Sequence, residues 1–157
     1  MAALGYNSER FVPYFTKCWG VKQSETRTVP HHDHGSAHIS AVYYPRVPEG
    51  AGAFALTHFN HPNEFFTTAF NEDSYADGNV SRTIHTDAEQ YIKVEDDLLL
   101  LFPSKTKHRT MPNKSSEPRY SVTADIVLTM KSVDRVEYGL PPLELWKKAE
   151  WSIPASN

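Results

Sequence analysis

The sequence has almost no cysteine, no run of basic residues and no long apolar segment. Cys18 is the single cysteine among 157 residues, so an internal disulfide framework is excluded and a reducing compartment is expected. Sixteen Lys and Arg against 19 Asp and Glu give a formal charge of −3, which offers nucleic acid no electrostatic attraction. The first residues lack the apolar core of a signal peptide, and no apolar run approaches membrane-spanning length. We therefore expect a cytoplasmic protein that binds neither nucleic acid nor membrane.

Length and composition are typical of one globular domain, and we expect residues 1–157 to form a single one. Hydrophobic residues make up 39% of the chain and charged residues 22%, which is enough to build one core. Neither repeats nor low-complexity segments occur. Eight histidines are many for this length, and they direct attention to metal chemistry.

Helical periodicity is weak, and short β-rich runs alternate with turn residues. Strands are predicted at 37–44, 53–59, 81–86, 89–94, 97–102 and 119–130, with another beginning near 109–111. The first two are predicted to pair as a hairpin around "PRVPEGAG". Strand 119–130 alternates so that Arg119, Ser121, Thr123 and Asp125 share one face. This pattern predicts an all-β jelly roll or barrel with a polar interior.

Two further segments carry predictions. The long connection 60–79 is polar and aromatic, and such a connection is more often functional than idle, so a substrate lid is one interpretation. Prolines precede Leu, Trp and Ala at helical spacing in "PPLELWKKAEW", which predicts a C-terminal helix over 141–151.

A cluster of three histidines and an aspartate offers metal ligands at 31–34. Both His31-x-Asp33 and His32-x-His34 place two side chains on one side of an extended chain, and a polar turn without chemistry is the simpler alternative. His108, after a buried strand and a short loop, is the leading third ligand. Three protein ligands leave open positions for a co-substrate and dioxygen. Arg119, with Ser121 on the same face, would suit the far carboxylate of a dicarboxylate.

Two blocks of sequence resemble a known enzyme family. "HDHGSAHISAVYYPRVPEG" followed by "LLLLFPSKTKHRTMPNKSSEPRYSV" is similar to the small bacterial and phage 2-oxoglutarate- and Fe(II)-dependent oxygenases. Their pattern reads H-x-H, S-G-V-Y-Y, P-E-G, F-P-S-x-x-x-H and R-x-S. The resemblance covers about residues 19–130 and implies a double-stranded β-helix, a cupin-like jelly roll with few peripheral helices. It also implies Fe(II), 2-oxoglutarate as co-substrate, and dioxygen.

Site residues follow from matching this pattern residue by residue. It implies His32, His34 and His108 as catalytic iron ligands, because the second histidine of the family stands six positions before the serine matched by Ser40. The same match implies that Arg119 binds the distal carboxylate of 2-oxoglutarate. Ser121 and Tyr44 are then expected beside that carboxylate.

The resemblance predicts a dioxygenase that hydroxylates an unactivated C–H bond of a small molecule or of an amino-acid or peptidyl substrate. Small barrels with exposed edge strands often pair, so a homodimer is one expected assembly. Ala41 and Val21 depart from the expected glycine and asparagine, and "THFN" replaces an acidic-Pro-Arg run, so substrate specificity does not carry over. His31 and Asp33 stay an alternative metal pair. A three-histidine cupin-type dioxygenase without 2-oxoglutarate and a non-catalytic jelly-roll binding module stay alternative functions.

Overall fold

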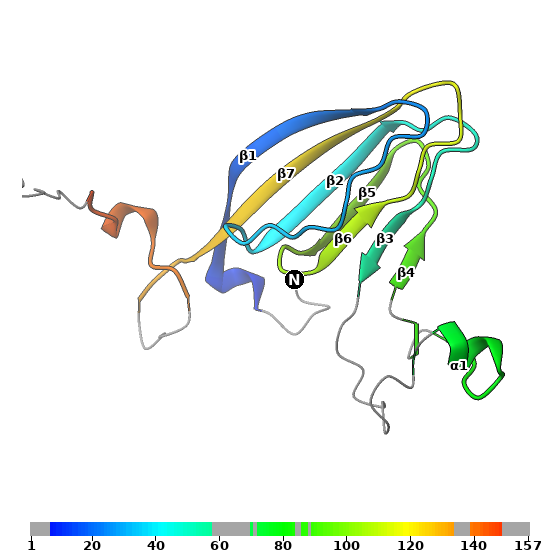
Figure 1. The fold of residues 1–157 in the computed structure, drawn as a ribbon. Coiled ribbons are helices and arrows are strands. Elements are labelled where there is room, and N and C mark those ends of the chain that lie inside the picture. The colour runs from blue at the N-terminus through cyan, green and yellow to red at the C-terminus, as the bar shows by residue number, and fades with distance from the viewer. Residues whose placement is uncertain are drawn as a thin grey trace, which may run out of the picture. The chain divides into compact units, whose positions relative to one another are not determined.

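The computed structural model describes residues 7–57, 70, 72–83, 86–87, 89–133 and 139–148 (Figure 1). Within these residues, strands dominate and helices are short. The elements, in chain order, are η2 (Ser8–Arg10), β1 (Phe11–Gln23), β2 (Ile39–Arg46), β3 (Phe54–Thr57), α1 (Glu72–Ala76), β4 (Glu89–Ile92), β5 (Leu98–Pro103), β6 (Lys107–Thr110), β7 (Arg119–Met130) and η3 (Leu143–Leu145). None of the helices described is long or apolar enough to cross a bilayer.

The strands form two sheets. One has the order β1-β7-β2-β5 and the other β4-β3-β6 (Figure 1). Strand β2 pairs antiparallel with both β5 and β7, and β3 pairs antiparallel with both β4 and β6. The predicted hairpin between β2 and β3 is therefore wrong, because the strands on either side of "PRVPEGAG" lie in different sheets. This exchange between sheets gives the all-β jelly roll that the sequence predicts.

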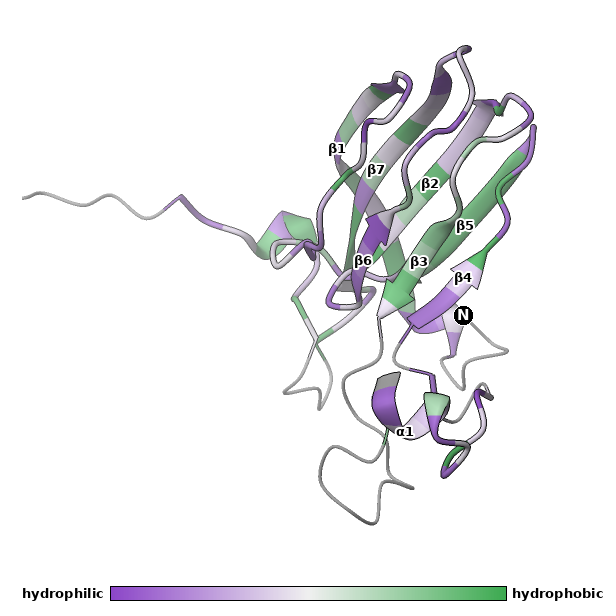
Figure 2. Ribbon diagram, turned by 45° about the vertical axis from the view of Figure 1, so that its right-hand side comes forward, coloured by the Kyte–Doolittle hydropathy of each residue, from purple (hydrophilic) through white to green (hydrophobic). Residues whose placement is uncertain are grey.

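The hydrophobic core lies between the two sheets. Its buried residues are Val42 and Tyr44 of β2, Phe54 of β3, Phe102 of β5, and Val94, which follows β4. Alternation along β2 and β5 aims every second side chain at this core. We expected β5 to be wholly buried, and Figure 2 shows it hydrophobic along its length, but Leu99 and Leu101 are 54% and 62% exposed. Its outward face is thus apolar and open to solvent.

The chain divides into two compact units. Phe15–Ile126 makes one unit and contains every predicted site residue. The other comprises Met1–Tyr14 and Val127–Asn157. In that second unit the amide of Lys131 donates to the carbonyl of Arg10 at 2.9 Å, and the amide of Met130 donates to Leu140 at 2.7 Å.

One strand has no counterpart among the predictions, and two local predictions need correction or lie outside the described residues. The strand without a counterpart is β1, the longest of the sheet strands, in which Pro13 and Gly20 interrupt the β pattern. The expected strand at 81–86 is not formed at 81–83, and 84–85 are not described. Most of the candidate lid 60–79 is also not described, although α1 lies in its later part.

The predicted C-terminal helix over 141–151 is wrong for the part that the structure describes. Only η3 is helical, and Trp146 is already extended with φ −74° and ψ 133°. Leu145 and Trp146 are each at least half exposed. A segment of this length is marginal as a helix unless its apolar face is packed, and here that face is not buried.

Candidate metal centre

The backbone joins the two blocks that supply the histidines. His32 and His108 form an isolated antiparallel bridge in which each amide donates to the carbonyl of the other, at 3.1 and 3.0 Å. The amide of His34 donates to the carbonyl of Ser104 at 2.9 Å. The fully buried hydroxyls of Ser40 and Ser104 are hydrogen-bonded at 2.9 Å. The motif serines therefore hold the loop of "HHDH" against the loop of "FPSKTKH".

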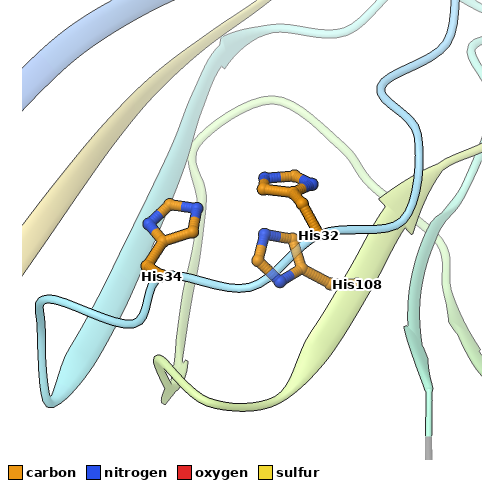
Figure 3. A group of neighbouring side chains, drawn as sticks. All are labelled: His32, His34 and His108. Atoms are coloured by element: carbon orange, nitrogen blue, oxygen red, sulfur yellow. The ribbon is translucent and has the colours of Figure 1, made fainter.

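The three predicted metal ligands converge. Figure 3 shows the side chains of His32, His34 and His108 pointing toward one another, and one nitrogen of each lies within 4.8 Å of the others. Their ring centroids are 4.2 to 5.2 Å apart. Among the residues that the structure describes, these three form the one group with metal-binding geometry.

Each of these histidines is held by its Nδ1 atom. Nδ1 of His32 lies 2.8 Å from the carbonyl oxygen of Pro30, and Nδ1 of His108 lies 2.9 Å from that of Thr106. Since a carbonyl can only accept, both Nδ1 atoms must carry the proton. Nδ1 of His34 meets the carboxylate of Asp125 instead. The Nε2 lone pairs are thereby left for a metal, which is the arrangement that metal-ligating histidines need.

The walls around His108 are apolar. Phe102 meets its ring edge-on at 4.8 Å between centroids, and Phe54 stacks at 5.4 Å. His108 is 3% exposed, and this burial lowers its pKa to about 4. The imidazole is therefore neutral at pH 7, as a ligand must be.

The alternative pair, His31 and Asp33, does not join the group. Nε2 of His31 points to Glu89 on β4, at 2.8 Å from its Oε1. Arg109 donates to both oxygens of Glu89, through Nε at 2.8 Å and Nη2 at 2.5 Å. This fork is the main reason that the pKa of Glu89 is lowered to about 2, and the bonds from Tyr91 and His31 add to it. His31 thus ties the loop to the β4-β3-β6 sheet.

Arg119 is a buried cation that meets no acidic side chain among the residues that the structure describes. Its residue is 2% exposed, and no ion pair within the described ranges includes it. Nη1 donates to the carbonyl of Gly52 at 2.5 Å, and Nη2 donates to the side-chain oxygen of Gln23. Its guanidinium lies 5.4 Å from the ring centre of Tyr44, and burial lowers the pKa of Arg119. Burial likewise raises the pKa of Tyr44 to about 12, a rise that Arg119 partly opposes.

One cavity is shared by the three histidines and Arg119. It has a volume of about 70 Å³ and is lined by all six residues that the resemblance implied: His32, His34, His108, Arg119, Ser121 and Tyr44. Trp19, Val21, Val29 and Val42 contribute apolar surface to it. A cluster of imidazole nitrogens and a buried guanidinium therefore face the same enclosed space.

Some residues of the site have no local signal in the sequence. Gln23 at the end of β1 accepts from Arg119 and, through the same oxygen, from Thr110 at 3.1 Å. Asn113 is fully buried and donates to the carbonyl of Gln23 at 3.1 Å. Asp125 lies on the inward face of its strand, as the alternation predicts, but its contact with His34 depends on folding.

The chain is similar to known proteins both in sequence and in fold. A family model described as 2OG-Fe(II) oxygenase matches residues 17–125. Curated proteins yield no match. Among solved structures, a 2OG-Fe(II) oxygenase family oxidoreductase from Burkholderia pseudomallei has a TM-score of 0.55 at 8% identity, over 75% of this chain and 46% of its own.

Two further solved structures are similar to a lesser degree. A Pseudomonas putida prolyl-4-hydroxylase has a TM-score of 0.44 at 16% identity, over 74% of this chain and 53% of its own. Iron-bound HygX from Streptomyces hygroscopicus has a TM-score of 0.48 at 12% identity, over 73% and 58%. The chain spans about half the length of these structures. The family match covers more than half of the sequence, and the chain therefore belongs to the 2OG-Fe(II) oxygenase family, which uses Fe(II), 2-oxoglutarate and dioxygen.

Proposed function

We propose that this chain is a dioxygenase that hydroxylates an unactivated C–H bond of a small molecule or of an amino-acid or peptidyl substrate. His32, His34 and His108 would hold Fe(II), and Arg119 would bind the distal carboxylate of 2-oxoglutarate. The observation that carries the proposal is one cavity lined both by the three histidines and by a buried arginine for which the described residues offer no acidic partner.

The donor set fits Fe(II). Imidazole suits first-row metals, and the Nδ1 contacts of all three histidines leave Nε2 available. The mutual backbone bonds of His32 and His108 fix two of the ligands before any metal binds. Such preorganisation means that less conformational entropy is lost on binding. His31 is occupied by Glu89, which favours the His32 and His34 pair over His31 and Asp33.

The other end of the cavity fits a carboxylate. A buried guanidinium is costly unless it is paired, and the neutral oxygens of Gln23 and Gly52 each accept one hydrogen bond from it without neutralising its charge. The carboxylate of a bound co-substrate would supply the negative charge that balances Arg119. Ser121 and Tyr44, which line the same cavity, offer hydroxyl groups beside Arg119.

The roles of the chain are then to bind, orient and exclude water. The chemistry that Fe(II), 2-oxoglutarate and dioxygen supply when bound is insertion of one oxygen atom into a C–H bond, with decarboxylation of 2-oxoglutarate to succinate and CO₂. Arg119 at one end and the histidines at the other would fix the direction in which the co-substrate lies. Val42 lines this cavity, and Phe54 and Phe102 pack against the ring of His108, so apolar side chains would help to exclude water from the metal ligands.

The proposal is tested by anaerobic calorimetry on the Fe(II)-loaded protein with two ligands. 2-Oxoglutarate is compared with 2-oxobutyrate, which keeps the 2-oxo acid group and lacks the distal carboxylate. The wild type should prefer 2-oxoglutarate by at least about 30-fold, the equivalent of about 2 kcal/mol for a buried charge pair. Arg119→Ala should lose this preference, whereas Arg46→Ala, which removes an exposed arginine from the end of β2, should keep it.

Two results would contradict the proposal. One is a wild-type protein that binds Fe(II) but neither oxo acid, which would favour a three-histidine dioxygenase without 2-oxoglutarate or a binding module. The other is an Arg119→Ala variant that discriminates between the two acids as well as the wild type does.

A further inference from the structure

The Nδ1 partners of the three clustered histidines are not equivalent. His32 and His108 each meet a backbone carbonyl, which is neutral. His34 meets the carboxylate of Asp125, which is charged when ionised. One imidazole of the cluster is therefore bonded to an anion, and the other two are not.

Asp125 is buried and has few ways to offset its charge. Its side chain is 4% exposed, and that of His34 is 8% exposed. Within the described part of the chain, neither lysine nor arginine forms an ion pair with Asp125. A buried carboxylate is costly unless a positive charge lies near it. A metal ion held by the three histidines would lie on the other side of the His34 ring and would supply such a charge.

The strand geometry fixes this contact. Asp125 stands opposite Ser40 in the pairing of β7 with β2, and Ser40 in turn bonds to Ser104, whose carbonyl accepts from the amide of His34. Both the backbone and the ring of His34 are thus held by residues of one sheet region.

We infer that Asp125 is a positioning residue of the metal centre, which acts through His34 and supplies the negative charge that three neutral histidines lack. This inference rests on the proposed function, since it assumes that the three histidines bind Fe(II). An imidazole that donates to a carboxylate is a stronger electron donor to its metal. The site then resembles, in charge, one with a carboxylate ligand, although the carboxylate lies one hydrogen bond away.

The first test measures Fe(II) affinity anaerobically by competition with a chromophoric chelator. Asp125→Asn keeps a hydrogen-bond acceptor of the same size and removes the charge, and we expect the affinity to fall about 10- to 100-fold. Asp33→Asn is the matched control, because Asp33 lies between two of the histidines and outside the metal-binding group. It should change the affinity less than threefold. Equal losses in both variants, or wild-type affinity in Asp125→Asn, would overturn the inference.

The second test needs no variant of Asp125. In the Zn(II)-loaded wild type, NMR of the histidine rings should show all three Nδ1 protons, with that of His34 furthest downfield because its acceptor is a carboxylate. A His34 ring that is protonated on Nε2, or a resonance like those of the other two, would overturn the inference even if Asp125→Asn failed to fold.

Failure of the inference and failure of the proposed function are distinguishable with His108→Ala. If His108→Ala binds Fe(II) as the wild type does, the proposed metal site is wrong, whatever Asp125 does. If His108→Ala loses Fe(II) and Asp125→Asn does not, the metal site stands and only the role of Asp125 is refuted.

Discussion

Gly52 stands in the segment before β3, and its carbonyl accepts from the buried Arg119, so its replacement by alanine tests both the backbone packing and the proposed role of this arginine. A Cβ atom at this position would stand 2.4 Å from the carbonyl oxygens of Met111 and Pro112, which no real Cβ contact allows. Both obstacles are backbone atoms, so relief requires the chain before β3 to shift. Overpacking of this kind costs about 3 kcal/mol, which is more than a 100-fold change in the unfolding equilibrium.

The same shift should reach the site. The carbonyl of Gly52 accepts from Nη1 of Arg119 at 2.5 Å, so displacement of Gly52 displaces the guanidinium or leaves one donor unmet. Gly52→Ala should therefore bind 2-oxoglutarate at least tenfold more weakly while still binding Fe(II). Urea unfolding and calorimetry measure the two effects. Gly20→Ala, where nothing lies within 4 Å of the added atom, should change neither. A Gly52→Ala protein as stable as the wild type would show that the predicted clash does not exist.

Three further predictions concern the supports of the site. Ser40→Ala should cost about 1–3 kcal/mol by leaving the buried hydroxyl of Ser104 unpaired, and the double alanine variant should cost less than the sum of the single ones in urea unfolding. The pKa of Glu89, lowered to about 2, means that its contribution to stability is complete above about 4.5 and falls as the pH drops toward 2. Urea midpoints across that range should therefore decline more steeply in the wild type than in Glu89→Gln. His31→Ala should keep one equivalent of Fe(II) while His32→Ala loses it, and the reverse result would identify His31 as the ligand.

The sequence predicts well those parts of the fold that depend on local pattern. Alternation over 119–130 identifies β7 with its bounds, and it assigns Arg119 and Asp125 to the inward face. The family pattern assigns His32, His34 and His108 to one site, and the folded chain gathers the same three. Residues of one motif stay close together in the folded chain when the motif lies on a single strand or a single short loop.

What the sequence does not predict depends on contacts between distant segments. Strand partners are one case, since β2 pairs with β5 and β7 rather than with β3, its neighbour in sequence. The ambiguity between His31 and His32 is another. His31 is hydrogen-bonded to Glu89, which stands 58 residues later, and no local pattern in the sequence predicts that contact. The acceptors that hold Arg119 likewise come from β1 and from the turn before β3.

The three histidines and Arg119 are proposed to form one site for Fe(II) and 2-oxoglutarate, and a single binding measurement can decide this. It is the calorimetric affinity of the wild type for 2-oxoglutarate with and without Fe(II) under anaerobic conditions. We expect one binding site per chain, with tight binding only when Fe(II) is present and a clear preference over 2-oxobutyrate. Equal affinity with and without the metal, or no binding in either case, would show that the histidines and Arg119 do not act as one site.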